Sequence, residues 1–308
     1  MTGHDKQQSV AIIGLGSIGG IAAACLADVG RHDVTGCARR PLDHLTLEGP
    51  DRTITVPLRV ITEPAMAEPV DWVLLVTKTQ DTQAAAPWLA RLCTQATRVA
   101  VMQNGIDHVE RVAPLTRGAT VFPVIVYYNG ERLAPDRVRM RIAGDHDLAV
   151  ADDEPGRAFS ALLDGTGLRV RREADFVTLK WRKLLLNAVA NPITALTLQR
   201  QAVLRRADVH ALCLDVLEET VRIARADGAT LPDDEPKLAM ERLMKFAPEL
   251  GTSMYFDRLA GRAFEVEALT GAIVAAGERH GLATPLNRML LTLLRAINEA
   301  PRETPTPR

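Results

Sequence analysis

The sequence predicts an α/β fold whose N-terminal part is a doubly wound sheet and whose C-terminal part is all helical. Short β-rich runs at 9–13, 33–37, 71–77 and 98–102 alternate with helical ones, such as the run of small residues at 18–29. Continuous apolar runs such as those at 71–77 and 98–102 are typical of parallel strands that are covered on both faces. Their alternation with helices indicates a doubly wound sheet.

The pattern changes twice along the rest of the chain. From about residue 115 it reads as strands linked by short turns, with little helix between them. After Asp175 nearly everything favours helix. We therefore expect a sheet-containing domain at 1–174 and a helical domain at 175–300. The segment 301–308 is proline-rich and charged, which predicts a disordered tail.

Composition and charge argue against nucleic-acid and membrane partners. Charged residues make up 24% of the chain, apolar residues 47%, and the net charge is −1. No apolar run is long enough to span a bilayer, and the polar start MTGHDKQQ does not read as a signal peptide. The four cysteines are scattered without metal-ligand spacing, and Cys25 and Cys213 fall in apolar helical runs where a buried thiol is expected. We expect a soluble, cytoplasmic protein without a bound metal.

A glycine-rich hexapeptide, GLGSIG, lies between the first predicted strand and the first predicted helix. Its residues are Gly14, Leu15, Gly16, Ser17, Ile18 and Gly19. Alone, such a hexapeptide could be a plain turn, but this strand-loop-helix context is the one that a dinucleotide-binding loop requires. Gly14 would allow the tight turn, Gly16 the approach of the pyrophosphate, and Gly19 the packing of helix on strand. The sequence therefore predicts a Rossmann-type domain.

The end of the second predicted strand indicates which dinucleotide is bound. Sites that prefer NAD usually place Asp or Glu there to bind the ribose hydroxyls. This chain has Arg39 and Arg40 instead. A guanidinium can pair with the 2′-phosphate of NADP, although two arginines at a strand end can also be merely solvated. We expect NADP, used as NADPH.

A polar line interrupts the first apolar run of the helical region. Lys183, Asn187 and Asn191 are spaced by four, so on a helix they lie on one face. Burying an ammonium and two carboxamides without partners would cost several kcal/mol, so this face should meet either solvent or a ligand that forms hydrogen bonds. Pro192 should end or kink the helix just beyond the line.

Three further stretches complete the pattern. VTKTQDT and MQNGID place Lys78 and Asn104 after the third and fourth predicted strands. TSMYFDRLAGRAFEVEALTG follows in the helical region. With these stretches the chain resembles the ketopantoate reductase family, from about residue 9 to 297. The resemblance implies that Lys78 and Asn104 lie around the nicotinamide end of the cofactor. It also implies that Tyr128 touches the cofactor mainly through its backbone.

The same resemblance implies roles for the helical region. Lys183 matches the general acid, and Asn187 and Asn191 match asparagines that bind the substrate. Ser253 matches a serine that binds the substrate carboxylate, although it could instead be a helix cap. Glu265 matches a catalytic glutamate that faces the lysine and the nicotinamide side, although it could be a solvated helical residue.

One departure from the family concerns the substrate. The family usually carries an Asn-Gly pair where this chain has Gln201 and Ala202. Gln201 could still donate a hydrogen bond to the substrate from a longer side chain. The change puts the identity of the substrate in doubt more than the reaction.

These features predict NADPH-dependent reduction of ketopantoate (2-dehydropantoate) to pantoate, a step of pantothenate biosynthesis, with a lysine general acid. The alternatives are reduction of another small 2-keto acid and a non-catalytic NADPH-binding sensor, which should lack the lysine or the glutamate. A two-domain 3-hydroxyacid dehydrogenase is a further rival, but Ser253 and Glu265 argue against it. The expected partner is a small 2-keto acid, and a homodimer is one assembly that these features allow.

Overall fold

The computed structural model describes residues 7–142 and 144–299, and the tail expected at 301–308 lies outside them. The chain divides into two compact units. The first extends to Gln103 and from Asp107 to Phe176. The second consists of Asn104–Ile106 and the chain from Val177 onward. A three-residue segment from the first half of the sequence is thus part of the helical unit.

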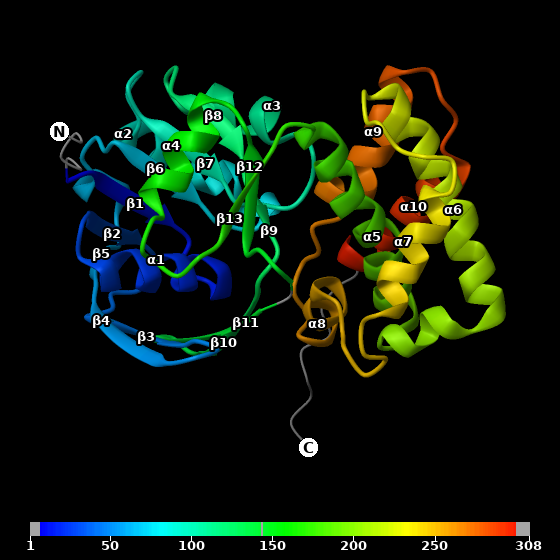
Figure 1. The fold of residues 1–308 in the computed structure, drawn as a ribbon, viewed down its shortest axis with the longest axis horizontal. Helices are drawn as coiled ribbons and strands as arrows, with labels where there is room; N and C mark the ends of the chain where they lie inside the picture. The colour runs from blue at the N-terminus through cyan, green and yellow to red at the C-terminus, as the bar shows by residue number, and fades with distance from the viewer. Residues whose placement is uncertain (1–6, 143, 300–308) are drawn as a thin grey trace. The chain divides into compact units, whose positions relative to one another are not determined.

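A six-stranded parallel sheet forms the centre of the first unit (Figure 1). Its order is β5-β2-β1-β6-β7-β8. The strands are β1 (Ser9–Ile13), β2 (Asp33–Cys37), β5 (Arg59–Ile61), β6 (Trp72–Leu75), β7 (Arg98–Val101) and β8 (Thr120–Pro123). The parallel arrangement was predicted, whereas β5 was not. Because all six are parallel, their carboxyl ends share one edge, which is where ligands of open α/β sheets bind.

Both faces of this sheet are covered, as a doubly wound fold requires. In β1, Val10 and Ile12 belong to one buried cluster, while Ala11 and Ile13 belong to another. The first cluster includes α1 (Ser17–Val29) and α4 (Glu154–Leu162). The second includes α2 (Ala86–Leu92) and α3 (His108–Val112). All four cysteines are buried and free, which confirms the prediction for Cys25 and Cys213.

Helix α4 corrects the expectation of little helix between residues 115 and 174. The Asp153 side chain accepts a hydrogen bond from the Gly156 N–H at 2.9 Å and so caps the first turn. The buried Phe159 of this helix packs against Trp72 and Phe122 of the sheet. An N-cap and an aromatic contact therefore stabilise a short helix that its own composition did not reveal.

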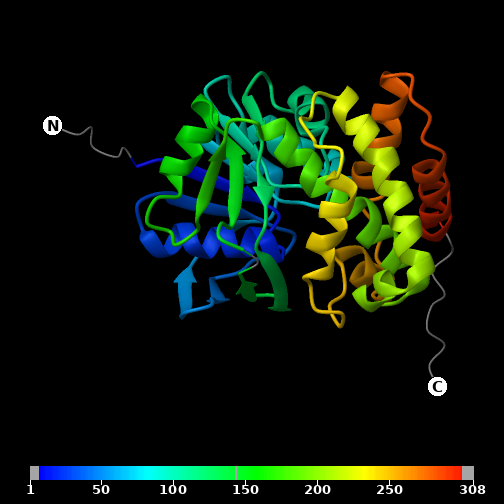
Figure 2. The same cartoon turned by 45° about the vertical axis from the view of Figure 1, so that its right-hand side comes forward.

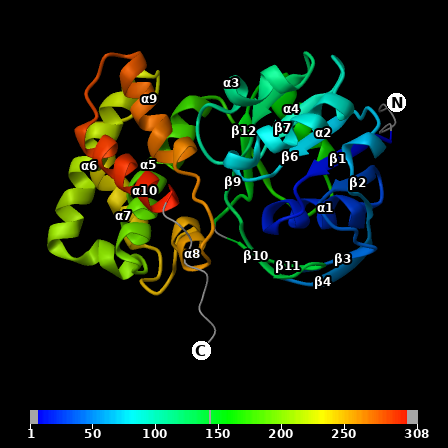
Figure 3. The same ribbon diagram turned by 180° about the vertical axis from the view of Figure 1, so that it is seen from behind.

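Two smaller sheets complete the first unit. The four-stranded sheet β10-β11-β3-β4 packs on the side of α1 opposite the main sheet, as Figures 1 and 3 show. Its strands are β3 (His44–Glu48), β4 (Thr53–Pro57), β10 (Asn129–Ala134) and β11 (Arg137–Arg141). The three-stranded sheet β13-β12-β9 consists of β9 (Ile125–Val126), β12 (Leu148–Ala151) and β13 (Val170–Glu173). Short 3₁₀ turns are η1 (Pro64–Met66), η2 (Thr79–Asp81), η3 (Gln83–Ala85) and η4 (Ala113–Leu115).

The second unit is helical, as predicted. Its elements are α5 (Phe176–Thr197), η5 (Gln201–Arg205), α6 (Ala207–Ala226), α7 (Glu235–Met244), α8 (Ser253–Leu259), the π-helix η6 (Glu267–Gly271), α9 (Ala272–Arg279) and α10 (Pro285–Glu299). The apolar face of α5 lies in the core of this unit, and α10 packs beside α6 (Figure 2). Within the described residues, no helix is long and apolar enough to cross a membrane.

Pro192 was expected to end or kink the helix, but α5 passes through Pro192 and ends at Thr197, so the expected helix end at Pro192 is wrong. Pro192 lacks the N–H that would bond to the carbonyl of Ala188. The Thr194 hydroxyl bonds to the Ala190 carbonyl at 2.7 Å, which does not replace the lost bond to Ala188. Arg258 donates to the carbonyls of Ala195 and Leu196 at the end of the helix. The apolar residues on both sides of Pro192 are buried in the core of this unit, and this packing offsets the lost backbone bond.

Candidate functional site

The glycine loop has the geometry of a dinucleotide cradle. Gly14 has a φ of +102°, a backbone conformation that side chains rarely adopt. A Cβ at Gly19 would lie 2.0 Å from the Gly14 carbonyl oxygen, so only glycine lets α1 approach the loop this closely. A Cβ at Gly16 would meet nothing within 4 Å. The backbone at Gly16 therefore faces open space, as the approach of a pyrophosphate requires.

The N-terminus of α1 is free to bind an anion. Its first turn contains no acidic residue, and no side chain of the described residues caps it. The first N–H groups of a helix lack internal partners, and the helix dipole favours negative charge there. Because the loop leaves room at Gly16 and the helix supplies the donors, this unit fits a dinucleotide cofactor.

Three further cofactor candidates follow strands of the same sheet. Arg39 and Arg40 follow the end of β2 after one intervening residue and are exposed, and neither has a hydrogen bond or ion pair within the described residues. Lys78 follows β6 and is half-buried at the start of η2. In the parallel sheet β1 lies between β2 and β6, so the carboxyl ends of these three strands are neighbours. All three residues therefore lie at the same edge of the sheet as the glycine loop, which follows β1.

Tyr128 is tied to the glycine loop by its side chain. It is 3% exposed, and its hydroxyl donates to the Ile18 carbonyl at 3.0 Å. Burial raises the pKa of this phenol well above its ordinary value, so the hydroxyl keeps its proton as a donor. The side chain of Tyr128 therefore fixes the first turn of α1, a positioning contact that the sequence did not reveal.

In the second unit, Lys183, Asn187 and Asn191 lie on α5. Lys183 is half-buried, and loss of hydration lowers the pKa of its ammonium from 10.5 to about 8. Asn191 is 3% exposed and donates from Nδ2 to Asn187 Oδ1 at 3.2 Å. The Asn187 amide NH₂ makes no hydrogen bond within the described residues, so it is available to an acceptor on a ligand.

Ser253 joins this line from α8. Its hydroxyl donates to Asn191 Oδ1 at 3.4 Å, and the Met254 N–H donates to the same oxygen at 3.4 Å. The helix cap is Thr252, whose hydroxyl accepts from the Tyr255 N–H, so Ser253 is not the cap. Ser253, Asn191 and Asn187 thus form one chain of hydrogen bonds that ends in a free amide donor.

No sequence pattern singles out Thr194 and Thr252. Their hydroxyls lie 2.7 Å apart and link α5 to the start of α8. Thr194 follows Asn191 at helical spacing and Thr252 directly precedes Ser253, so both adjoin predicted residues. Nothing in the sequence, however, indicates that these two segments meet.

Glu265 is 8% exposed and accepts a hydrogen bond from Asn104. The distance from Asn104 Nδ2 to Glu265 Oε2 is 3.0 Å. Asn104 is in the short segment that joins the helical unit, and the Lys180 ammonium donates to the neighbouring Ile106 carbonyl at 3.4 Å. Glu265 also comes just before the π-helix η6, a distortion that is frequent at functional sites. It is therefore a held, buried carboxylate and not a solvated one.

Gln201 is not joined to the polar line of α5 by any hydrogen bond of the described residues. It is 7% exposed, and its N–H donates to the Leu250 carbonyl at 2.9 Å. Ala202 donates in the same way to the Pro248 carbonyl. The side-chain amide oxygen of Gln201 is buried and has no hydrogen-bond partner among the described residues. The backbone at Gln201 is therefore tied to the segment that leads to Ser253, and one side-chain acceptor is left unsatisfied.

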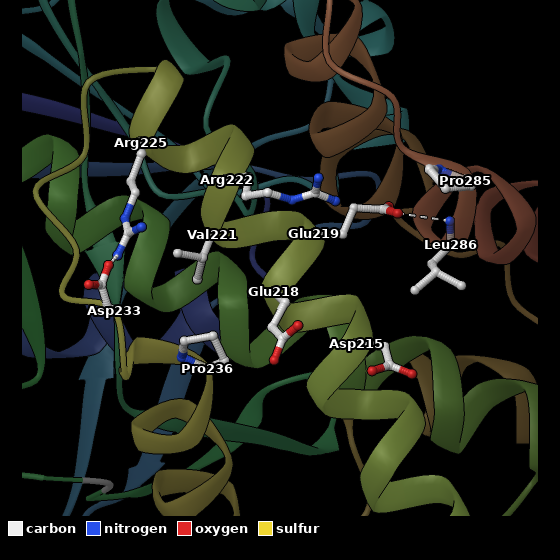
Figure 4. A pocket seen from close by; sticks show the side chains of 10 residues that line it. All are labelled: Asp215, Glu218, Glu219, Val221, Arg222, Arg225, Asp233, Pro236, Pro285 and Leu286. Atoms are coloured by element: carbon white, nitrogen blue, oxygen red, sulfur yellow. Dashed lines mark hydrogen bonds and ion pairs between the residues drawn. The ribbon is translucent and has the colours of Figure 1, made fainter.

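A separate cavity of about 560 Å³ lies among α6, α7 and the start of α10 (Figure 4). None of the predicted site residues lines it. Glu219 at its edge is buried and accepts hydrogen bonds from the Leu286 and Asn287 N–H groups at 3.0 and 2.8 Å. Arg225 pairs with Asp233. Two charged side chains that line the cavity, those of Glu219 and Arg225, are therefore already engaged in contacts within the protein.

A dinucleotide loop in one unit and a lysine, two asparagines, a serine and a glutamate in the other define a two-domain, nicotinamide-dependent oxidoreductase. Comparison with known families agrees. The family described as "Ketopantoate reductase PanE/ApbA" matches residues 10–153, and "Ketopantoate reductase PanE/ApbA C terminal" matches residues 175–298. The chain belongs to the ketopantoate reductase family.

Relatives match along nearly the whole chain. A 2-dehydropantoate 2-reductase of Caulobacter vibrioides is 38% identical, over 94% of this chain and 98% of the relative. One from Mycobacterium tuberculosis is 40% identical, over 95% and 98%. The crystal structure of a PanE/ApbA family ketopantoate reductase from Ralstonia eutropha is 31% identical with a TM-score of 0.85, covering 94% of this chain and 98% of that one. A Staphylococcus aureus ketopantoate reductase described as dimeric is 27% identical with a TM-score of 0.83, covering 94% and 99%.

Proposed function

We propose that this protein reduces 2-dehydropantoate to pantoate with NADPH. The observation that carries the proposal is the likeness to 2-dehydropantoate 2-reductases, which spans both units at 38–40% identity. The chain offers a candidate residue for each role that such a reaction needs. A nicotinamide supplies a hydride to the 2-keto carbon when it is bound, and the protein must bind the substrate and deliver one proton to the keto oxygen.

The cofactor site in this proposal consists of Gly14–Gly19, Arg39, Arg40, Lys78, Asn104 and Tyr128. The loop N–H groups receive the pyrophosphate. Arg39 and Arg40 are exposed and uncommitted within the described residues, which leaves them available to a 2′-phosphate. This assignment favours NADPH over NADH, because no acidic side chain follows β2 to bind ribose hydroxyls.

Lys183 is the general acid in this proposal. With a pKa of about 8 its ammonium is mostly protonated at neutral pH, and yet it releases a proton more readily than an exposed lysine. It stabilises the negative charge that develops on the keto oxygen and then transfers its proton there, leaving a neutral amine. Glu265, oriented by Asn104, is the second catalytic residue and favours the ammonium form before the transfer.

Substrate binding is assigned to Asn187, Asn191, Ser253 and Gln201. Neutral amide and hydroxyl groups can hold carboxylate and hydroxyl oxygens without adding charge. The uncommitted NH₂ of Asn187 is the available donor, and the exposed Ser253 hydroxyl, which donates to Asn191, still has lone pairs that can accept a hydrogen bond from a ligand. Because Gln201 and Ala202 replace the family's Asn-Gly pair, a second candidate function is the reduction of another small 2-keto acid.

The proposal also covers the domains, the location and the assembly of the protein. We assign the cofactor to a domain at 1–174, and the substrate and the catalytic groups to a domain at 175–300. We assign the protein to the cytoplasm. We also propose a homodimer, by analogy with the Staphylococcus aureus enzyme that is described as dimeric.

The experiment that tests the function is a spectrophotometric screen of NADPH oxidation against a panel of 2-keto acids. We expect the largest kcat/KM with 2-dehydropantoate. A larger value with another 2-keto acid would favour the second candidate. Absence of NADPH oxidation with every acid, by a protein that binds NADPH, would indicate a sensor instead.

A further inference from the structure

One face of the chain at β10 covers the glycine loop from Leu15 to Ile18. Residues two apart in an extended strand share a face, and Tyr128, Gly130 and Arg132 follow this spacing. The Tyr128 hydroxyl bonds to the Ile18 carbonyl at 3.0 Å. A Cβ at Gly130 would lie 2.9 Å from the Ser17 Cβ. Each of the three residues therefore meets a different part of the loop and of the first turn of α1.

Arg132 makes the contact with the loop itself. Its Nη1 donates to the Leu15 carbonyl at 2.9 Å. Nη2 donates to the Pro135 carbonyl at 2.8 Å, and Nε to the Ala134 carbonyl at 3.4 Å. One planar guanidinium thus ties the hairpin end of β10 to the glycine loop, and its rigid fork suits several acceptors at once.

Arg132 differs from the arginines of the neighbouring strand. On β11, Arg137 and Arg139 pair with Glu48, and Arg141 pairs with Glu131. Arg132 has no carboxylate partner within the described residues, and its three acceptors are backbone carbonyls. The orientation of the Arg132 side chain is therefore not set by an ion pair. It is set by hydrogen bonds to backbone carbonyls, including that of Leu15 in the glycine loop.

The Leu15–Gly16 peptide gives this contact a consequence for the ligand. A trans peptide is planar, and its C=O and N–H point in opposite directions. Fixing the Leu15 carbonyl toward Arg132 turns the Gly16 N–H to the opposite side. Gly16 is also the loop residue with open space around its Cβ position. The N–H is therefore held ready at the point where the loop leaves room for a phosphate.

We propose that Arg132 is a positioning residue for the pyrophosphate of the dinucleotide, acting through the Leu15 carbonyl on the Gly16 N–H. The inference deepens the proposed cofactor site and rests on it. It distinguishes Arg132 from Arg39 and Arg40, which are assigned to the 2′-phosphate. Because the Gly16 N–H points away from the guanidinium, Arg132 acts on the shape of the loop and not as an ion-pair partner of the phosphate.

Binding of cofactor fragments to the purified full chain tests this inference without any turnover. The Arg132→Leu variant should raise the Kd of NADPH and that of NADH by the same factor, about tenfold, since both contain the pyrophosphate. The Kd of adenosine 2′-monophosphate, which lacks it, should not change. Titration of the fluorescence of the reduced nicotinamide gives the first two constants, and competition gives the third.

Two variants separate position from charge and from general damage. Arg132→Lys keeps the charge but cannot span three carbonyls, so it should behave like Arg132→Leu. Arg141→Leu removes an exposed arginine from the same sheet and should bind all three ligands like the wild type. In the apo protein, hydrogen exchange of peptides covering the loop should become faster in both Arg132 variants and not in Arg141→Leu.

Each other result overturns the inference. If Arg132→Leu binds NADPH with the wild-type Kd, the contact with Leu15 does not contribute to cofactor binding. If Arg132→Lys binds NADPH with the wild-type Kd, the positive charge alone is sufficient. An equal loss of adenosine 2′-monophosphate binding would place Arg132 in the wrong part of the site. If the wild type itself does not bind NADPH, the proposed function fails first, while the exchange measurement on the apo protein still tests the contact with the loop.

Discussion

The Asn104 amide donates to the Glu265 carboxylate at 3.0 Å, across a sequence separation of 161 residues. Asn104 comes from the loop after β7, yet it is part of the helical unit together with Glu265. A bond to a charged acceptor fixes the orientation of the carboxylate more strongly than a neutral bond would. Asn104 therefore holds a proposed catalytic group in place, in addition to any contact with a cofactor.

Replacing Asn104 by alanine should separate these two roles. Loss of a hydrogen bond to a charged group costs about 1.5–3 kcal/mol, so we expect kcat to fall by roughly tenfold or more. The Kd of NADPH should stay within about threefold if orienting Glu265 is the main role. Asn104→Asp, which sets a second carboxylate beside the first, should lower kcat further. A rise in Kd with an unchanged kcat would instead place Asn104 against the cofactor.

The pKa of Lys183, lowered by burial to about 8, predicts opposite pH profiles for the two directions of the reaction. Reduction needs the ammonium, which is present below pH 8, so kcat/KM for the keto acid should fall about tenfold per unit at higher pH. Oxidation of pantoate needs the neutral amine, so its rate should rise until about pH 8.

Lys183→Ala should lower kcat at least about a hundredfold and leave NADPH binding intact.

The exposed Lys237 on α7 provides the matched control, and its alanine variant should keep both profiles. A reduction profile that stays flat to pH 10, in an enzyme whose chemical step limits the rate, would contradict the assignment of Lys183 as proton donor.

Features that depend on local patterns could be predicted from the sequence. β1 and β2 have the predicted limits because a short run of strand-forming residues bounded by polar ones contains its own signal. The glycine loop and the spacing of Lys183, Asn187 and Asn191 are also local. The four-stranded sheet was not anticipated, because it pairs β11 with β3 across some ninety residues and much of its surface is exposed. Hydrophobic patterning does not specify such a partner.

The contacts that complete the site are non-local for the same reason. Asn104 with Glu265 and Thr194 with Thr252 join segments whose sequences carry no mark of each other. Pro192 shows the limit of a local rule, since tertiary packing keeps α5 continuous where the backbone preference of proline favours a break.

The two arginines after β2 predict a preference for NADPH. Loss of a guanidinium contact with the 2′-phosphate should cost about 1.5–3 kcal/mol. Arg39→Ala should therefore raise the KM for NADPH at least about tenfold and leave that for NADH nearly unchanged. Equal use of both cofactors by the wild type would contradict this prediction, which initial rates at varied cofactor concentration check directly.

Glu219 should matter for stability and not for catalysis. Its buried carboxylate accepts three hydrogen bonds from the start of α10, one from Leu286 N and two from Asn287. Glu219→Ala leaves these donors unpaired and should lower the free energy of unfolding by about 2–4 kcal/mol in urea titrations. The adjacent Glu218 is exposed, so Glu218→Ala should change it by less than about 0.5 kcal/mol. A similar loss in both variants would rule out the capping role.

Substrate choice should depend on the hydrogen-bond chain that ends at Asn187. A pocket that bonds to a hydroxyl rejects an analogue without it far more strongly than an apolar pocket rejects a methyl group. Suppose that the Asn187 amide forms a hydrogen bond with the 4-hydroxyl of 2-dehydropantoate. The analogue 2-ketoisovalerate lacks the hydroxymethyl arm, so its specificity constant should be lower than that of 2-dehydropantoate by about a hundredfold or more.

Asn187→Ala should lower the specificity constant for 2-dehydropantoate far more than that for 2-ketoisovalerate, so the difference between the two substrates should become smaller. Asn187 is a sharper choice than Asn191, because Asn191 is buried and also holds Ser253 and Met254, so that its removal would disturb the pocket as a whole. The measurement is four specificity constants, for two substrates with the wild type and with Asn187→Ala. Should the wild type use 2-ketoisovalerate as well as 2-dehydropantoate, the pocket does not read the hydroxyl, and a reductase for a different 2-keto acid becomes the better assignment.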